Sequence, residues 1–183
     1  MKRDELEHVI RAAATVAGEH EIVIVGSQAI LGQFPNAPDT MLFSQEADVY
    51  PRERPEKAIE IDGAMGDGSQ FHETFGYYAH GVGPETAKAP AGWQDRLVPV
   101  RVPLAVDQQV QATGWCMEAH DLVLAKLAAG RERDLDFAVH AIRNDIVDPQ
   151  ELLRRVPDLP LGKQHRDHVR SLLESALVKA NKE

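Results

Sequence analysis

The N-terminal part of the chain combines one amphipathic segment with short apolar runs. Residues 3–17 carry apolar side chains at the spacing of one helix face, and Gly18 is placed to end that helix. Residues 22–25 form an unbroken apolar run that ends in a Gly-Ser step, which is typical of a strand buried on both faces and feeding a turn. The pattern predicts a helix that covers one side of a buried strand.

The next hundred residues predict four further strands separated by irregular segments. A short helix over residues 28–32 leads to a proline-containing loop over 33–39, and a strand over 44–50 stops at Pro51. A helix is expected over 55–65. Residues 66–96 are rich in glycine, proline and aromatic side chains, and we expect a strand over 77–82 within a loop that covers a site. Residues 97–102 predict an edge strand because Pro99 lacks a ladder donor, and a last short strand is expected over 113–117.

From about residue 119 the pattern is helical to the end. Residues 169–180 carry a continuous apolar stripe, and Asp148-Pro-Gln-Glu151 predicts a capping box with proline in the first helical position. We therefore expect an α/β (α+β) fold with a mixed sheet and flanking helices. Residues 1–118 would form its core, and residues 119–183 a helical C-terminal part packed on that core.

Two carboxylates in the second strand suggest a metal site. Glu46 and Asp48 are two residues apart, and side chains at that spacing point to the same face of a strand. Neighbouring carboxylates repel each other unless a cation lies between them. Mg²⁺ is the expected ion, with Mn²⁺ as an alternative. The competing interpretation is a solvated acidic strand without a ligand.

The Gly-Ser step after the first strand suggests a phosphate site. Gly26 lets the backbone approach a ligand closely, and Ser27 offers a hydroxyl and an N–H near the start of a helix. Phosphate at this step and metal at Glu46 and Asp48 together describe a site for a nucleoside triphosphate. Ser27 could equally act only as a helix cap.

Composition limits the function classes. The chain has 29 acidic and 20 basic side chains and a net charge of −9, which argues against broad, non-specific nucleic-acid binding. An RNA substrate met through a local basic patch remains compatible with this charge. The single cysteine, Cys116, lies in an apolar setting and is expected to be a core thiol in a reducing cytoplasm. No run of about 20 apolar residues predicts a membrane span.

Two motifs resemble a known superfamily. The Gly-Ser step followed by an acidic-x-Asp strand is similar to the minimal nucleotidyltransferases of the polymerase-beta-like fold. A downstream segment resembles the AbiEii-type nucleotidyltransferases of phage-defence systems, and it reads His120-Asp121-Leu-Val-Leu-Ala-Lys126-Leu-Ala-Ala-Gly-Arg131-Glu-Arg133-Asp134. Together with the segments that begin at Ser44 and His72, these motifs suggest a small bacterial branch, over roughly residues 20–140.

The resemblance implies roles for several residues. Glu46 and Asp48 would hold the metal, Gly26 and Ser27 would cradle phosphates, and Lys126 would face the nucleotide. Arg131 and Asp134 would contact phosphate or dock their helix, and Asp121 would cap or orient the lysine helix. Without the resemblance, Lys126 would extend its ammonium to water, and the arginines would form the salt-laced start of a helix.

Two departures from the superfamily leave a second function open. The first acid of the pair is Glu46 where aspartate is usual, and residues 97–102 supply no third carboxylate, with only Asp95 and Asp107 nearby. His72 is expected to be a hydrogen-bonded group rather than a ligand. The first hypothesis is a Mg²⁺-dependent nucleotidyltransferase acting on an RNA, protein or small-molecule hydroxyl. The alternative is a catalytically silent binding protein, one half of a toxin–antitoxin or defence pair with a cognate partner protein.

Overall fold

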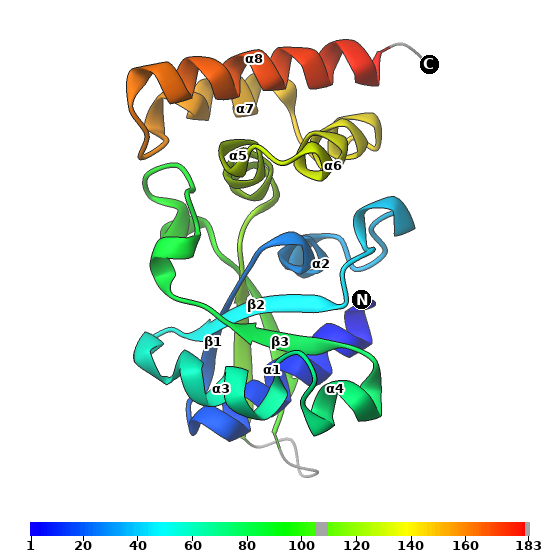
Figure 1. Cartoon of the computed structure of the whole chain (residues 1–183), viewed down its shortest axis with the longest axis vertical. Helices are drawn as coiled ribbons and strands as arrows, with labels where there is room; N and C mark the ends of the chain where they lie inside the picture. The colour runs from blue at the N-terminus through cyan, green and yellow to red at the C-terminus, as the bar shows by residue number, and fades with distance from the viewer. Residues whose placement is uncertain (105–109, 182–183) are drawn as a thin grey trace.

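A five-stranded mixed sheet in the order β3-β2-β1-β5-β4 forms the centre of the computed structural model, which describes residues 1–104 and 110–181 (Figure 1). The strands are β1 (Glu21–Val25), β2 (Glu46–Pro51), β3 (Tyr78–Gly81), β4 (Val98–Pro103) and β5 (Gln111–Cys116). β1 pairs antiparallel with β2 and parallel with β5, the β2–β3 pair is parallel and the β4–β5 pair is antiparallel. The α/β class expected from the sequence is confirmed, and the strand with Pro99 is an edge strand.

Helices cover both faces of the sheet. One face carries α1 (Arg3–Ala17), α3 (Ala58–Met65) and α4 (Gln70–Phe75), and the other carries α2 (Ile30–Gln33) (Figure 1). Beyond α2 lie α5 (Ala119–Ala129), α6 (Glu132–Arg143), α7 (Pro149–Arg155) and α8 (Lys163–Ala180). Short 3₁₀ turns are η1 (Ser27–Ala29), η2 (Asp39–Met41), η3 (Pro55–Lys57), η4 (Pro84–Thr86), η5 (Trp93–Arg96) and η6 (Val156–Asp158). No helix in the described part of the chain is long and apolar enough to cross a membrane.

The central strand β1 explains why the first helix docks where it does. Ile22 and Ile24 are fully buried, as a strand covered on both faces requires. Ile10 of α1 and Ile24 meet over Gly114 of β5, where an added Cβ would lie 2.4 Å from Ile10 Cδ1. A side chain at this position would therefore push α1 away from the sheet.

The segment expected to be irregular over residues 66–96 contains the helix α4, which the pattern did not predict. The Ser69 side chain caps this helix by accepting a hydrogen bond from the His72 N–H at 3.1 Å, and Gly76 ends it in a left-handed conformation. Phe71 and Phe75 pack their rings around His8 of α1. These contacts hold α4 against α1.

The capping box expected at Asp148 is only half present. The Asp148 side chain accepts from the Gln150 N–H at 2.8 Å, as a cap does. Glu151 does not return to the Asp148 backbone, because it binds Arg154 and Arg155. The Asp148 N–H instead donates to His120 Nε2 at 2.9 Å.

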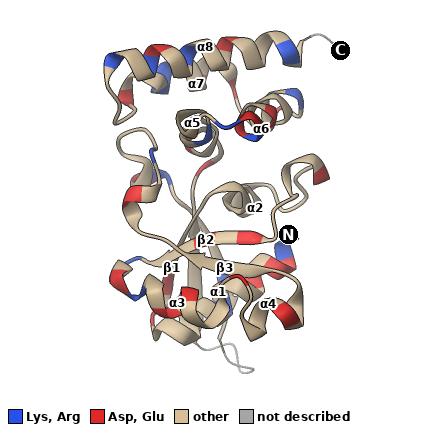
Figure 2. Ribbon diagram, in the orientation of Figure 1, with Lys and Arg blue, Asp and Glu red and all other residues tan. Residues whose placement is uncertain are grey.

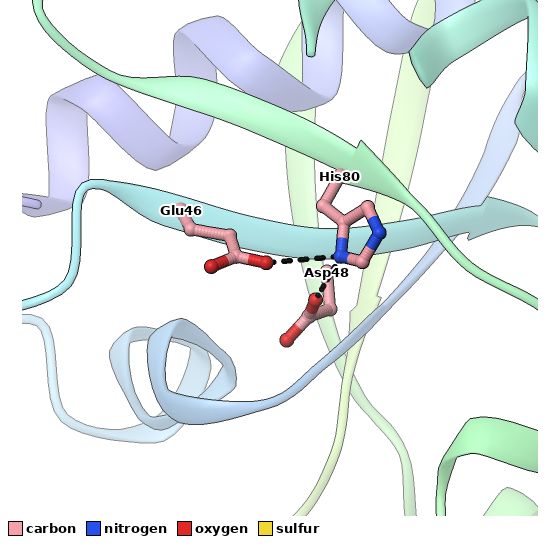
Figure 3. Close-up of side chains that lie close together, drawn as sticks. All are labelled: Glu46, Asp48 and His80. Atoms are coloured by element: carbon pink, nitrogen blue, oxygen red, sulfur yellow. Dashed lines mark hydrogen bonds and ion pairs between the residues drawn. The ribbon is translucent and has the colours of Figure 1, made fainter. Parts of the chain in front are cut away.

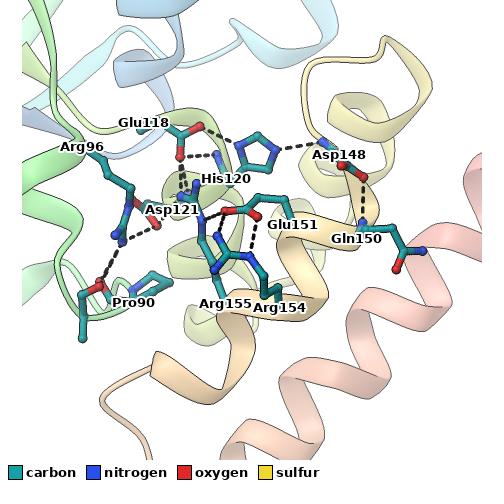
Figure 4. A network of polar contacts seen from close by, with 11 residues as sticks. Pro90, Arg96, Glu118, His120, Asp121, Asp148, Gln150, Glu151, Arg154 and Arg155 are labelled. Carbon is teal, nitrogen blue, oxygen red and sulfur yellow. Dashed lines mark hydrogen bonds and ion pairs between the residues drawn. The ribbon is translucent and has the colours of Figure 1, made fainter.

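A buried ion-pair network fixes α5 and α7 to the core (Figure 4). Asp121 is fully buried and binds two arginines: Arg96 Nε at 2.7 Å and Arg155 Nη1 at 2.9 Å. Glu118 caps α5 by accepting from the His120 N–H, and it binds Arg155 Nη1 at 2.6 Å. Burial alone would raise the pKa of Glu118, but its bonds to His120 and Arg155 outweigh that effect and lower the pKa to about 2. Glu118 is therefore the cap. Of the two roles expected for Asp121, it does not cap the helix but orients it through Arg96 and Arg155.

Candidate active site

Three side chains that could hold a metal meet on the β2–β3 pair (Figure 3). Glu46 and Asp48 point to the same face of β2, and His80 is the register partner of Asp48 on β3. His80 Nδ1 lies 2.9 Å from Glu46 Oε1 and 3.1 Å from Asp48 Oδ1. The three side chains each offer a ligand atom, and these atoms lie within 4.8 Å of one another. Two carboxylates and one imidazole form a donor set that fits a divalent cation.

The electrostatics of this cluster favour a bound positive charge. Burial and the neighbouring charge of Glu46 raise the pKa of Asp48 to about 6. Burial would lower the pKa of His80, but its bonds to Asp48 and the charge of Glu46 outweigh this and raise the pKa. A protonated imidazole thus partly neutralises the two carboxylates, which is the role that a metal ion would take over.

We expect this cluster to make the metal-free protein less stable as the pH rises from about 4 to 6 and then through the raised pKa of His80. The folded-state pKa of Asp48 lies above its usual value of 3.8, so the folded protein holds this proton more tightly and folding is progressively disfavoured as the pH rises to about 6. The pKa of His80 is also raised, so its favourable contribution is complete below its unfolded pKa of 6.5 and is lost as the pH rises through its folded value. Both effects therefore have the same sign.

Urea unfolding at a series of pH values in a chelator measures this effect. Asp48→Asn removes the Asp48 contribution, which is no more than about 3 kcal/mol for a pKa shift of about two units. The curve of the variant is expected to be flatter than that of the unchanged protein between about pH 4 and 6. Parallel curves would show that Asp48 is not destabilised by its surroundings.

The turn after β1 brings the backbone against the cluster. Gly26 has φ 68° and ψ −171°, and a Cβ built there would lie 2.2 Å from Asp48 Oδ2. Only glycine allows this approach. Gln28, fully buried, donates from Nε2 to the Ser44 carbonyl at 2.9 Å and so ties this turn to the start of β2. The helix expected over residues 28–32 is divided into η1 and the four-residue α2, so a helix dipole contributes little here.

A cleft of about 600 Å³ joins all the site residues predicted from the sequence. One wall comes from the sheet and its turns, with Gly26, Ser27, Glu46, Asp48 and His80. The facing wall comes from α5 and α6, with Lys126, Arg131, Arg133, Asp134, Asp136, Phe137 and His140. Of residues 66–96, His80, Thr86 and Ala87 reach the cleft, whereas His72 stacks on Tyr78 at a ring distance of 4.7 Å and does not line it.

Lys126 neither extends freely into the cleft nor reaches open water. Its Nζ binds Asp134 Oδ1 at 2.8 Å and lies 4.7 Å from the centre of the Phe137 ring, and 13 % of its side chain is exposed. The second oxygen, Asp134 Oδ2, is buried without a hydrogen-bond partner in the described structure. Arg131 and Arg133 are exposed at the same wall. Asp134 therefore neutralises part of the charge of Lys126. Arg131 and Arg133 are the most accessible cations of this wall of the cleft.

Acidic and basic side chains are distributed unequally between the two parts of the chain that form the walls of the cleft. Residues 1–118 contain 18 acidic and 9 basic side chains, whereas residues 119–183 contain 11 of each (Figure 2). A cation is thus attracted to the sheet side of the cleft, and an anion meets less repulsion at the helical side.

Comparison with known proteins identifies the family. The family described as "Nucleotidyltransferase of unknown function (DUF6036)" matches residues 4–159. The chain belongs to this nucleotidyltransferase family. A nucleotidyltransferase of this kind uses a nucleoside triphosphate and a divalent metal, and the carboxylate–imidazole cluster is a suitable place for that metal. No curated protein and no solved structure matches the chain.

His80 is the site residue of this nucleotidyltransferase that the sequence analysis did not find. A third acidic ligand was expected on residues 97–102, but this strand, β4, lies at the opposite edge of the sheet from β3. The strand next to Glu46 and Asp48 is β3, and it supplies an imidazole there. Asp107 lies outside the described residues, and the cluster of the described part contains no third carboxylate. Alternation along residues 77–82 was the only available signal, because it places Tyr78 and His80 on one face.

Proposed function

We propose that this protein is a divalent-metal-dependent nucleotidyltransferase that moves a nucleoside monophosphate from a triphosphate to a hydroxyl of an RNA, a protein or a small molecule. The observation that carries the proposal is one cleft in which the Glu46–Asp48–His80 cluster faces the wall of α5 and α6 that presents Arg131 and Arg133. Its volume of about 600 Å³ suits a ligand of nucleotide size.

Each wall has a role in this proposal. Glu46, Asp48 and His80 would hold the metal, which when bound neutralises phosphate charge and aligns the attacking oxygen. Gly26 brings its backbone close enough for Ser27 to donate from its N–H and hydroxyl to a phosphate oxygen. Arg131 stabilises the negative charge of the triphosphate from the opposite wall.

Asp134 positions Lys126 in the site through their ion pair. The pair holds the ammonium at a fixed position in a partly dry wall, where its charge acts more strongly than in water. Phe43 lies at the cleft with 83 % of its surface exposed and offers a ring on which a base can stack.

Nucleotide binding and label transfer test the proposal. A nucleoside triphosphate with Mn²⁺ or Mg²⁺ is expected to raise the melting temperature, because a ligand that binds only the folded state stabilises it by mass action. Label on the α-phosphate is expected to move to total RNA, to protein or to a small acceptor. If no triphosphate changes the melting temperature and no label moves, the chain is not a nucleotidyltransferase of this kind.

The variant that removes the cation must not leave a buried charge behind. Lys126→Met alone strips Asp134, which is 4 % exposed, of its partner and is expected to destabilise the fold. Lys126→Met combined with Asp134→Asn removes both charges together. The double variant is expected to keep its melting temperature without ligand but to lose the shift given by the triphosphate, and Asp134→Asn alone serves as its control.

The alternative is a catalytically silent binding protein of a toxin–antitoxin or defence pair, and the AbiEii-type relationship remains part of this proposal. The observation in its favour is the donor set, which has Glu46 in place of aspartate and no third carboxylate in the described part of the chain. Nucleotide binding without label transfer, together with a small partner gene beside this one, would favour the pair. We also propose that residues 1–118 form a core and residues 119–183 a helical part packed on it. A cytoplasmic location is a further proposal.

A further inference from the structure

The donor set of the metal cluster differs from the one that Mg²⁺ prefers. Mg²⁺ takes oxygen ligands and retains several waters, whereas imidazole is a common ligand of first-row transition metals. Mn²⁺ accepts carboxylate and water oxygens as Mg²⁺ does, and it also tolerates nitrogen. Here one of the three available ligand atoms is a nitrogen, provided by His80.

The position of His80 is set by the sheet and not by a flexible loop. The parallel β2–β3 register places Asp48 opposite His80 and Glu46 opposite Tyr78. The Tyr78 hydroxyl donates to Glu46 Oε2 at 3.3 Å, which leaves Glu46 Oε1 facing the imidazole. His80 Nδ1 thus contacts both carboxylates at once, so an ion held between Glu46 and Asp48 also meets this nitrogen.

The cluster is open on one side. His80 is 49 % exposed in its side chain, and all three residues line the cleft. An ion held by three protein ligands therefore keeps further positions for water or for phosphate oxygens. Such an open site, with mixed oxygen and nitrogen ligands, suits a six-coordinate ion in contact with substrate.

We propose that this site binds Mn²⁺ in preference to Mg²⁺ and that His80 is the residue that sets the preference. The inference rests on the metal site of the proposed function, but it concerns the ion alone and holds whether or not the chain transfers nucleotides. Mg²⁺, the ion expected from the carboxylate pair in the sequence, would then bind more weakly than Mn²⁺. His80→Asp, which turns the set into three carboxylates, would bring the site back towards Mg²⁺.

The test measures metal affinity without nucleotide. Metal-stripped protein at about pH 8 is titrated with Mn²⁺ while free Mn²⁺ is followed by electron paramagnetic resonance, and Mg²⁺ affinity is obtained by competition. The ratio of Mn²⁺ to Mg²⁺ affinity is expected to fall roughly tenfold or more in His80→Asp, as loss of a metal-supporting group does elsewhere. His72→Asp makes the same substitution behind Tyr78 and is expected to leave the ratio unchanged.

A direct readout on the unchanged protein makes the test independent of the folding of any variant. Pulsed electron paramagnetic resonance of bound Mn²⁺ is expected to show a coupling to a directly bound nitrogen, which disappears in His80→Asp and persists in His72→Asp. Mn²⁺ that binds without nitrogen coupling, or an affinity ratio that His80→Asp leaves unchanged, would overturn the assignment of His80. A positive result beside absent label transfer would disprove the proposed function and leave the metal preference standing.

Discussion

Asp121→Asn is expected to lower the free energy of unfolding by about 3–5 kcal/mol, because it removes a fully buried carboxylate that neutralises two arginines. The asparagine has nearly the same shape, so the loss does not come from a cavity. It comes from Arg96, which loses its carboxylate partner, and from the weaker pairing of Arg155, which keeps only Glu118 and Glu151. For a chain of this size the change corresponds to roughly 6–20 °C in melting temperature. Thermal unfolding followed by circular dichroism measures it.

Asp167→Asn is the matched control, because it makes the same chemical change on α8. Asp167 pairs with Lys163 at 2.9 Å, but both side chains are largely exposed, at 60 % and 86 %. Surface pairs of this kind often contribute nothing measurable, so no change in melting temperature is expected. Equal effects of the two substitutions would mean that the Asp121 network does not hold α5 and α7 to the core.

Gly26→Ala is expected to abolish metal-dependent transfer, with a loss of roughly 100-fold or more. The new Cβ would lie 2.2 Å from Asp48 Oδ2, so the carboxylate must move away from its position in the cluster. Displacements of about 1 Å at a catalytic group reduce rates by this order. The backbone conformation is also nearly restricted to glycine, which adds a cost of about 1–3 kcal/mol in stability. Label transfer and Mn²⁺ affinity are the measurements.

Gly68→Ala separates backbone strain from the clash with Asp48. Gly68 also has a positive φ, of 74°, but a Cβ there meets no atom within 4 Å. This control is expected to lose stability while keeping the metal affinity of the unchanged protein. If Gly26→Ala binds Mn²⁺ as tightly as Gly68→Ala does, the close approach of the turn to Asp48 has no role in the site.

The parts of the site that could be predicted from the sequence are those governed by local periodicity. Glu46 and Asp48 share a face because the period of a strand is two, and Gly26 follows a run that only a buried strand explains. His80 lies 32 residues from Asp48, and its place depends on the parallel β2–β3 pairing. No local pattern encodes that pairing, because α3 and α4 lie between the two strands.

The partners of the two most buried acidic groups could not be predicted for a related reason. Asp121 was expected to cap or orient its helix, and Asp134 to contact phosphate or dock its helix, but helix periodicity describes only neighbours along one element. Asp121 in fact binds Arg96 from η5 and Arg155 from α7. Asp134 binds Lys126 across the bend between α5 and α6. Tertiary packing decides such partners, so the fold class was easier to predict than the charge network.

The single cysteine of the chain has a practical consequence for measuring these effects. Cys116 is fully buried at the end of β5, where burial raises the pKa of its thiol to about 12. Its side chain faces Gly32 of α2, so a thiol reagent can reach the sulfur only when the structure around α2 and β5 opens, and the closed state holds very little of the reactive thiolate. The rate of labelling then reports how often this region opens. The unaltered protein therefore already contains a reporter of its own local unfolding.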